Sequence, residues 1–269
     1  MNNVLTKCKS AIRCTYIKRY DFPVSDKGYV CCLENNLLPS IKLPADVYRE
    51  LKDGSGNELK EKFKALHSSS ALAVNAFAKW KSNTMDLFLC GKNGFKSLTF
   101  EKKCPTGLGG TPPNLDVFLD NDHLLIAVES KFLEYLTPKK GFFSASYTRD
   151  NLPQSEEACW YLIDRIKEQP KQHLDAAQLI KHYIGLRNLP LARDKEIVLL
   201  YLFWEPENWK DFEAFHRHRV EISDFASYFD ELSVKFIYQS YPELWDEWEQ
   251  HYENTTHVKE LRERYYLTI

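Results

Sequence analysis

The chain has 269 residues, of which 43% are hydrophobic, so it can bury a substantial core in one domain with additions. Its net charge of -2 argues against a strongly basic, obligate nucleic-acid binder. No run of 18 apolar residues exists and no signal-peptide apolar region follows Met1, so we expect a soluble, cytoplasmic protein without a membrane partner. Its 7 cysteines, an odd number without CxxC spacing, indicate reduced thiols and argue against zinc.

The first 57 residues carry no motif, and we interpret residues 1–57 as an N-terminal extension packed on a nuclease-like core formed by residues 58–269. Apolar residues then recur at helical spacings from Leu59 to Trp80, with Ser68 to Ser70 as a break and a fresh N-cap. The part after this break is expected to be a buried helix. The Asn75 side chain on that helix either hydrogen-bonds near a site or makes its hydrogen bonds within the core, and the second interpretation is favoured.

Residues 97–102 alternate apolar Leu98 and Phe100 with Thr99 and Glu101, which predicts a strand. A loop rich in Gly and Pro follows over residues 105–113, and it either admits a substrate closely or is an ordinary connection. Glu101 is accordingly either an additional carboxylate of a site or an exposed strand acid.

Two short apolar runs come next. In the first, residues 115–120, Asp116 belongs to the polar side of a period-two pattern typical of a strand with unlike faces. The second, residues 124–128, is continuously apolar, as in a central strand buried on both faces, and it ends in Glu129-Ser130-Lys131. Asn121 and Asp122 form the expected two-residue hairpin loop, because both tolerate positive φ.

This loop would pair Asp120 with His123 and would place Asp116 opposite Ala127. Asp116, Glu129 and Lys131 then share one face of the hairpin. Asp116 and Glu129 become diagonal neighbours, roughly 7–8 Å apart at the backbone. The inference depends on the turn, since a slip of one residue would move Asp116 to the opposite face.

Two carboxylates and a lysine on one face suit the hydrolysis of a phosphodiester. Mg²⁺ binds one or two carboxylates while keeping several waters, neutralises charge on the phosphate and lowers the pKa of a bound water. A lysine can hold the attacking water or the phosphate as a point charge. A lone Asp or a lone Glu-x-Lys is usually a solvated strand face, but their conjunction across a tight hairpin favours a site.

The segment after the hairpin contains a helix pattern and a strand pattern. Residues 174–186 have apolar side chains at helical spacing, and Gln178 and Lys181 on this stretch would by themselves be a solvated face. Residues 196–204, EIVLLYLFW, predict a buried strand that joins the sheet beside the hairpin and ends before Pro206.

The charge is distributed unevenly along the chain. Residues 1–200 hold 29 Lys and Arg against 23 Asp and Glu, whereas residues 201–269 hold 7 against 15. In the aromatic tail from Trp204 onward, this acidity favours helices packed on the core over base stacking. The run His216-Arg217-His218-Arg219 lacks an acid or cysteine to complete a zinc set and is interpreted as a surface run. Basic residues near the motif are available for phosphate contacts: Lys92, Lys96, Lys102, Lys103, Lys139, Lys140 and Arg149.

At Pro113-Asn114-Leu115-Asp116 and Glu129-Ser130-Lys131 the sequence resembles the PD-(D/E)XK nuclease superfamily, whose motif is an acid on one core strand and (D/E)-x-K on its hairpin partner. It is most similar to a bacterial restriction-endonuclease-like branch, in which one helix precedes the hairpin and another follows it. His67–Phe77 resembles the first helix and Asp175–His182 the second, and the resemblance covers roughly residues 60 to 250.

This resemblance implies an α/β fold, a central mixed sheet flanked by helices, and a magnesium-dependent nuclease acting on DNA in restriction or defence, with Mn²⁺ able to replace Mg²⁺. Asp116 and Glu129 would bind the metal with the Ser130 carbonyl, and Glu101 would be an additional carboxylate. Lys131 would position or activate the water, and Gln178 would support the site.

Several alternatives stay open. The chain could be a repair or recombination nuclease on the same fold, an inactive nucleic-acid-binding protein, or a module that binds a protein through its acidic tail. The intact Asp, Glu and Lys argue against the inactive protein. Because one site cuts one strand, double-strand cleavage would need a homodimer or sequential nicks, and the sequence does not choose between them.

Overall fold

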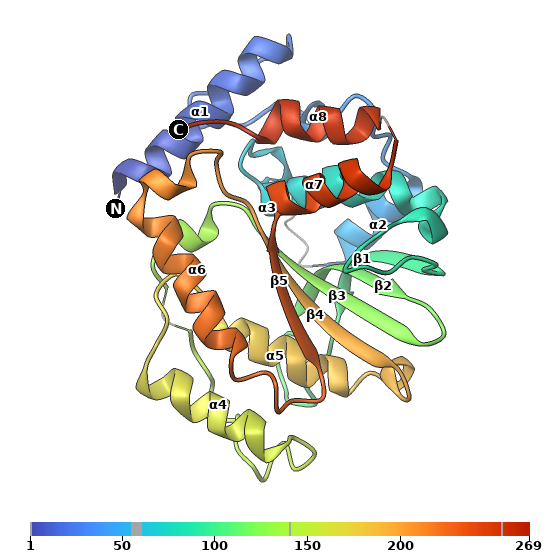
Figure 1. The fold of residues 1–269 in the computed structure, drawn as a ribbon, viewed down its shortest axis with the longest axis vertical. Coiled ribbons are helices and arrows are strands. Elements are labelled where there is room, and N and C mark those ends of the chain that lie inside the picture. Colours follow the sequence, from blue (N-terminus) through green and yellow to red (C-terminus); the bar gives the residue numbers. More distant parts are fainter. Residues whose placement is uncertain (1, 55–60, 140, 254) are drawn as a thin grey trace.

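The computed structural model describes residues 2–54, 61–139, 141–253 and 255–269. Leu59, Lys140 and the proposed boundary at residue 57 lie outside the described residues, so the division of the chain at that point stays a prediction. The helices and strands are arranged as Figure 1 shows. The helices are α1 (Asn2–Arg19), α2 (Ala45–Asp53), α3 (Ser69–Phe77), α4 (Glu157–Glu168), α5 (Ala176–Arg187), α6 (Glu213–Ala226), α7 (Tyr241–His251) and α8 (Thr256–Tyr265), and the strands are β1 (Ser97–Lys103), β2 (Asn114–Asp120), β3 (Leu124–Lys131), β4 (Glu196–Phe203) and β5 (Lys235–Ser240).

The strands form one mixed sheet in the order β1-β2-β3-β4-β5. β1, β2 and β3 are antiparallel neighbours joined by short connections, whereas β3, β4 and β5 run parallel. A parallel pair needs a long crossover, which α4 and α5 supply between β3 and β4 and α6 supplies between β4 and β5. The predicted strand at residues 196–204 therefore lies beside the hairpin, as expected.

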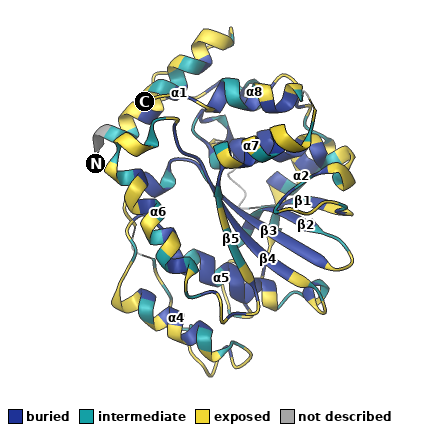
Figure 2. Cartoon of the chain, viewed as in Figure 1, coloured by how far each residue is buried: buried dark blue, intermediate teal, exposed yellow. Residues whose placement is uncertain are grey.

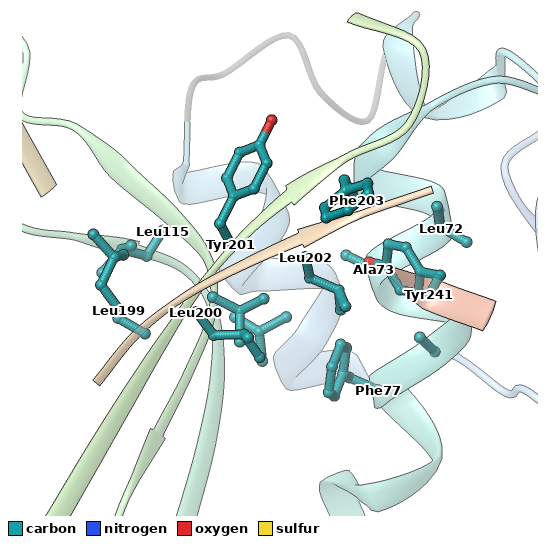
Figure 3. Close-up of a cluster of buried hydrophobic side chains, with 14 of the residues drawn as sticks. Leu72, Ala73, Phe77, Leu115, Leu199, Leu200, Tyr201, Leu202, Phe203 and Tyr241 are labelled. Carbon is teal, nitrogen blue, oxygen red and sulfur yellow. The ribbon is translucent and has the colours of Figure 1, made fainter. Parts of the chain in front are cut away.

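Helices cover both faces of this sheet, and the central strands β3 and β4 are almost entirely buried (Figure 2). Leu72, Ala73 and Phe77 of α3 pack near Leu200 and Leu202 of β4, and Tyr201 between those leucines points away from them (Figure 3). α5 packs on the face opposite α3. The alternation along the strands thus separates an α3 layer from an α5 layer.

The helix α3 begins where the serine run predicted an N-cap. The Ser68 hydroxyl accepts a hydrogen bond from the Ala71 backbone N–H at 3.2 Å. Asn75 is fully buried: its Oδ1 accepts from the Leu38 N–H, and its amide donates to the Asn36 carbonyl and the Tyr265 hydroxyl. The interpretation of Asn75 as a satisfied core residue is confirmed.

Among the C-terminal aromatics, Tyr241, Trp245 and Trp248 are fully buried in the core as predicted, whereas Tyr238 is exposed. The tail contains the expected helices α6, α7 and α8, and β5 in addition adds an edge strand to the sheet that the sequence did not predict. Its side chains do not alternate clearly between buried and exposed, so it has no period-two pattern. A signal was present just beyond it: Ser240 and Glu243 form a capping box that starts α7 directly at the end of β5.

The run His216-Arg217-His218-Arg219 is not wholly a surface run. His216 and Arg217 are exposed, but His218 is buried, stacks on the Tyr135 ring and contacts the Tyr201 hydroxyl through Nε2 at 2.9 Å. Arg219 forms an ion pair with the buried Glu205. The run lies on α6, so residues two apart point in different directions, and the sequence alone does not show which side faces the sheet.

All seven cysteines are free. Within the described part of the chain, no helix is both long and apolar enough to cross a membrane.

Candidate functional site

The β2–β3 hairpin turns one residue later than predicted. Asn121 N–H bonds to the Leu124 carbonyl, so Asp122 and His123 form the turn in place of Asn121 and Asp122. The Asn121 side-chain carbonyl accepts from the N–H groups of His123 and Leu124, which closes this turn. Asp120 consequently pairs with Leu125, and the predicted pairing of Asp120 with His123 is wrong.

The shifted turn changes which residues of β2 and β3 pair, but each side chain stays on the face of the sheet that was predicted for it. Moving the turn by one residue moves each pairing by two, and the side chains of a strand alternate with period two. Phe118, not Asp116, therefore lies opposite Ala127. The ladder ends at Val117 and Val128; one further step would put Asp116 directly opposite Glu129 rather than diagonal to it.

Where the ladder stops, the Asp116 side chain replaces a backbone partner. Its Oδ2 accepts a hydrogen bond from the Ser130 N–H at 2.6 Å. The hydroxyl of Ser130 points to the other layer and lies 2.7 Å from the Tyr241 hydroxyl at the start of α7. The middle residue of the Glu-x-Lys triplet is thereby bonded on both sides of β3.

Glu129 is almost completely buried, and both of its carboxylate oxygens have partners. Oε1 lies 2.5 Å from Lys131 Nζ, and Oε2 lies 2.8 Å from His182 Nε2 on α5. Burial alone would raise the pKa of Glu129, but the nearby Lys131 ammonium and His182 lower that pKa to about 2. Glu129 is therefore a carboxylate at neutral pH.

The pKa values of Lys131 and Asp116 are both raised, which favours the charged form of the lysine and the neutral form of the aspartic acid. Burial would lower the pKa of Lys131, yet Glu129 and Asp116 raise it above its ordinary value, so its side chain is an ammonium. The pKa of Asp116 is raised well above its usual value by burial, and Glu129 and Glu101 add to the effect. The carboxyl groups of Asp116, Glu129 and Glu101 thus lie near one another beside the Lys131 ammonium.

Gln178 reaches this cluster as predicted, because its Oε1 accepts from Lys131 Nζ at 3.1 Å. Lys181 does not: its Nζ donates to the carbonyl of Phe142 at 2.7 Å. α5 begins just before Gln178, where Asp175 Oδ1 caps the Gln178 N–H. Gln178 therefore projects from the first turn of a helix whose start is well defined.

Glu101 occupies a special backbone position. Its φ of 53° lies in the left-handed region, and the pairs of Phe100 with Val117 and of Lys102 with Leu115 bracket it, so it lies level with Asp116. Asn114 donates to its Oε2 at 3.2 Å. No set of three or more His, Cys, Asp or Glu within the described ranges is arranged to hold a metal ion, and the role of Glu101 as a ligand stays a prediction.

These side chains line an open cleft of about 540 Å³. The walls include Thr111 and Pro112 of the Gly- and Pro-rich loop, so that loop does border the site. The N-terminus of α3 forms another wall through Ser68 and Ser69. Because the cleft is open, Asp116 can be reached from outside, which a closed cavity would not allow.

The basic residues near the motif in sequence mostly lie elsewhere. Lys139 lines the cleft. Lys96 instead pairs with Asp122 at the hairpin turn, Arg149 pairs with Glu157, and Lys102 lies over the Phe118 ring. Proximity in sequence was therefore a poor guide to which basic side chains line the cleft.

Sequence reasoning did not select His182. It is fully buried and follows Gln178 by four residues, so both side chains project from the same face of α5. That spacing, a Gln and a His one turn apart on a helix that follows a Glu-x-Lys strand, was the signal available in the sequence. Gln178 contacts Lys131 while His182 contacts Glu129, and α5 thereby supports both charged members of the triplet.

The chain has no significant match among curated proteins or solved structures. A family model described as "Restriction Endonuclease associating with ARP" matches residues 9–266, which is nearly the whole chain. The mixed sheet flanked by helices is the restriction-endonuclease-like fold that the sequence motif implied. A family of this kind is nuclease-like and implies interaction with nucleic acid. The chain belongs to the family of restriction endonucleases associating with ARP.

Proposed function

We propose that the protein is a magnesium-dependent nuclease that hydrolyses phosphodiester bonds in DNA, with a role in restriction or defence. The observation that carries the proposal is the meeting of Asp116, Glu129 and Lys131 at one end of the sheet, in an open cleft. Membership in a restriction-endonuclease family supports the same conclusion. The supporting contacts of Gln178 and His182 are those expected of side chains that must hold a fixed geometry.

The residues fit a hard divalent cation. Mg²⁺ prefers oxygen ligands and needs only one or two carboxylates, since waters complete its shell. Asp116 and Glu129 would hold it together with the Ser130 carbonyl, and Glu101 would add charge from the neighbouring strand. The raised pKa of Asp116 supports this assignment, because a cation beside it would favour the carboxylate. Bound Mg²⁺, or Mn²⁺ in its place, would supply positive charge to the phosphate and polarise water.

The lysine has a separate task in this proposal. As an ammonium held by Glu129 and Gln178, Lys131 can donate hydrogen bonds to an incoming water or to a phosphate oxygen. Its side chain is 16% exposed, so it is held by the protein and still reaches the cleft. This combination stabilises negative charge where it develops during phosphodiester cleavage.

The direct test is cleavage of single-stranded, double-stranded and methylated DNA and of RNA, in Mg²⁺ or Mn²⁺. Asp116→Asn and Lys131→Met are each expected to lower the rate by about 100- to 1000-fold, as for loss of a group that stabilises transition-state charge. Supercoiled plasmid as substrate would separate single nicks from the double-strand breaks expected of a homodimer.

Matched controls lie outside the cleft. Asp120→Asn changes an acid on the same face of β2 that pairs with Lys195, and Lys96→Met changes the lysine that pairs with Asp122. Both should cleave at the wild-type rate. Absence of wild-type cleavage, or equal cleavage by Asp116→Asn, would refute the proposed nuclease.

A further inference from the structure

A second cavity lies between α1 and the turn at residues 25–28. Its volume is about 530 Å³, close to that of the catalytic cleft. Three basic side chains line it, namely Lys9 and Arg13 from α1 and Lys27 from the turn, and Asp26 is the one acid among the described residues of its lining. This cavity is separate from the residues proposed for catalysis.

The sequence of α1 explains why the basic side chains face this cavity. Cys8, Ile12 and Tyr16 recur every four residues and are buried in the core. Lys9 and Arg13, also four residues apart, lie on the next strip of the helix surface and line the cavity. Residues 2–19 contain no acid, and they carry five basic residues: Lys7, Lys9, Arg13, Lys18 and Arg19.

The cavity has a net positive charge, because its lining holds three basic side chains and one acid among the described residues. Within the part of the chain that the structure describes, no ion pair involves Lys9, Arg13 or Lys27. The Arg13 Nε atom is shielded from solvent and has no hydrogen-bond partner among the described residues. The cavity is therefore a concave, positively charged surface without an internal counter-charge for its two α1 cations.

Two residues belong to both cavities. Tyr29 and His67 line the catalytic cleft on one side and the basic cavity on the other. Their rings meet edge to face, with centroids 6.4 Å apart, and the Tyr29 side chain is 38% exposed. Backbone bonds from Val30 N–H to the Lys64 carbonyl and from Leu66 N–H to the Gly28 carbonyl hold Tyr29 in place. The two cavities are thus adjoining parts of one surface, with an aromatic ring between them.

We propose that this basic cavity binds the backbone phosphates of the same nucleic-acid strand that passes through the catalytic cleft. The inference rests on the proposed function, and it names the N-terminal helix α1 as a substrate-binding element. Lys9, Arg13 and Lys27 contact phosphates, because spaced phosphates are the polyanion that unpaired Lys and Arg side chains recognise. The exposed Tyr29 ring offers a stacking surface for a base as the strand crosses from one cavity to the other.

The test measures binding without cleavage. Fluorescence anisotropy in EDTA, with oligonucleotides of increasing length, compares wild type with Lys9→Glu/Arg13→Glu and with Lys27→Glu on the opposite wall. The α1 double variant is expected to weaken binding of the longer oligonucleotides by at least about 10-fold and to reduce the slope of log K against log salt by about 2. Single-stranded DNA, duplex DNA and RNA arms identify which backbone the cavity accepts.

Lys18→Glu is the matched control, since it makes the same charge change on the same helix but outside the lining, about 180° around the axis from Lys9. Its affinity should equal that of the wild type. Thermal melting shows whether each variant is folded, and Lys27→Glu tests the cavity from an element other than α1. Unchanged affinity and salt slope in both folded variants would overturn the inference. Binding that depends on these residues without cleavage by the wild type would instead refute only the proposed nuclease activity.

Discussion

The buried carboxylate of Glu129 is stabilised by a partner at each of its oxygens. Each oxygen has its own partner, Lys131 on the same strand and His182 on α5, and the side chain is only 2% exposed. A buried carboxylate that loses a partner costs more than the net energy of the lost bond, because the oxygen is left without water. The two partners are therefore expected to be far more sensitive to substitution than an exposed ion pair such as Lys96 with Asp122.

We predict that His182→Ala weakens both the fold and the site. Loss of the Nε2 contact to Glu129 should lower the free energy of unfolding by about 1–3 kcal/mol. It should also reduce the apparent affinity for Mg²⁺ by about 10- to 100-fold, as for other partners that orient a metal-binding carboxylate. Urea denaturation and Mg²⁺ titration of cleavage measure the two effects.

The variant His182→Gln tests whether His182 positions the Glu129 carboxylate or only fills space in the core. The amide of Gln can present a donor near the place of Nε2, so this variant should recover part of the Mg²⁺ affinity. If His182→Ala and His182→Gln have the same Mg²⁺ dependence as the wild type, His182 has no positioning role.

At the scale of elements, the distance between α5 and the end of β1 is set by a glycine. A Cβ on Gly185 would lie 2.3 Å from the carbonyl oxygen of Cys104, which is backbone and cannot move aside cheaply. Gly185 follows His182 by three residues and Gln178 by seven, so it shares their face of the helix. The absence of a side chain at residue 185 thus allows α5 to lie close enough for both contacts with β3.

Gly185→Ala should therefore lower stability even though alanine is the better helix former. We expect a loss of about 1–3 kcal/mol from overpacking, together with slower cleavage as Gln178 and His182 move away from Lys131 and Glu129. Gly109→Ala serves as the control, because a Cβ there meets nothing within 4 Å. A Gly185→Ala protein that melts at or above the wild-type temperature would contradict this account of α5.

The elements also show which parts of the fold could be predicted from sequence. β1 to β4 were predictable because they alternate or run apolar between clear breakers, and the start of α3 was predictable from Ser68. The hairpin turn was displaced because the Asn121 side chain, not the φ preference of Asn and Asp, closes it. β5 has no pattern of its own and is a strand because β4 offers it an edge.

In the candidate site, too, local sequence patterns predicted some features and contacts between distant elements determined the others. That Asp116, Glu129 and Lys131 share a face followed from strand parity, which survives a turn shifted by one residue. The resemblance implied that Gln178 supports the site, and the structure adds that it does so through Lys131. His182 and the position of Glu101 level with Asp116 depend on packing between elements distant in sequence, which no local pattern reports.

For the molecule as a whole, histidines with lowered pKa values make the free energy of unfolding depend on pH. His257, in the first turn of α8, contacts the Ala76 carbonyl at the end of α3 through Nε2 at 3.0 Å. Burial lowers its pKa to about 4, the Ala76 contact raises it less, and Lys79 lowers it further. Partial burial likewise lowers the pKa of His67 to about 4, and the full burial of His218 lowers its pKa well below the usual value.

Because these histidines are neutral in the folded protein and take up protons on unfolding, their contribution to stability is complete above about pH 6.5. It is lost as pH falls from about 6.5 towards 4, by roughly 3 kcal/mol for His257 alone. His257→Gln keeps a donor for the Ala76 carbonyl and should flatten this dependence. Urea denaturation between pH 7.5 and 4.5 measures the difference, and an unchanged slope in the variant would contradict the assignment to His257.

Ser130, the middle residue of the Glu-Ser-Lys triplet, connects β3 to both β2 and α7. Ser130 is bonded through its N–H to Asp116 and through its hydroxyl to Tyr241, the first residue of α7. One residue to either side, Lys131 is hydrogen-bonded to Gln178 of α5, and Glu129 lies in contact with His182 of the same helix. Three consecutive residues of β3 therefore tie the two helical layers together, so that a displacement of either layer is transmitted through one strand to the carboxylates in the cleft.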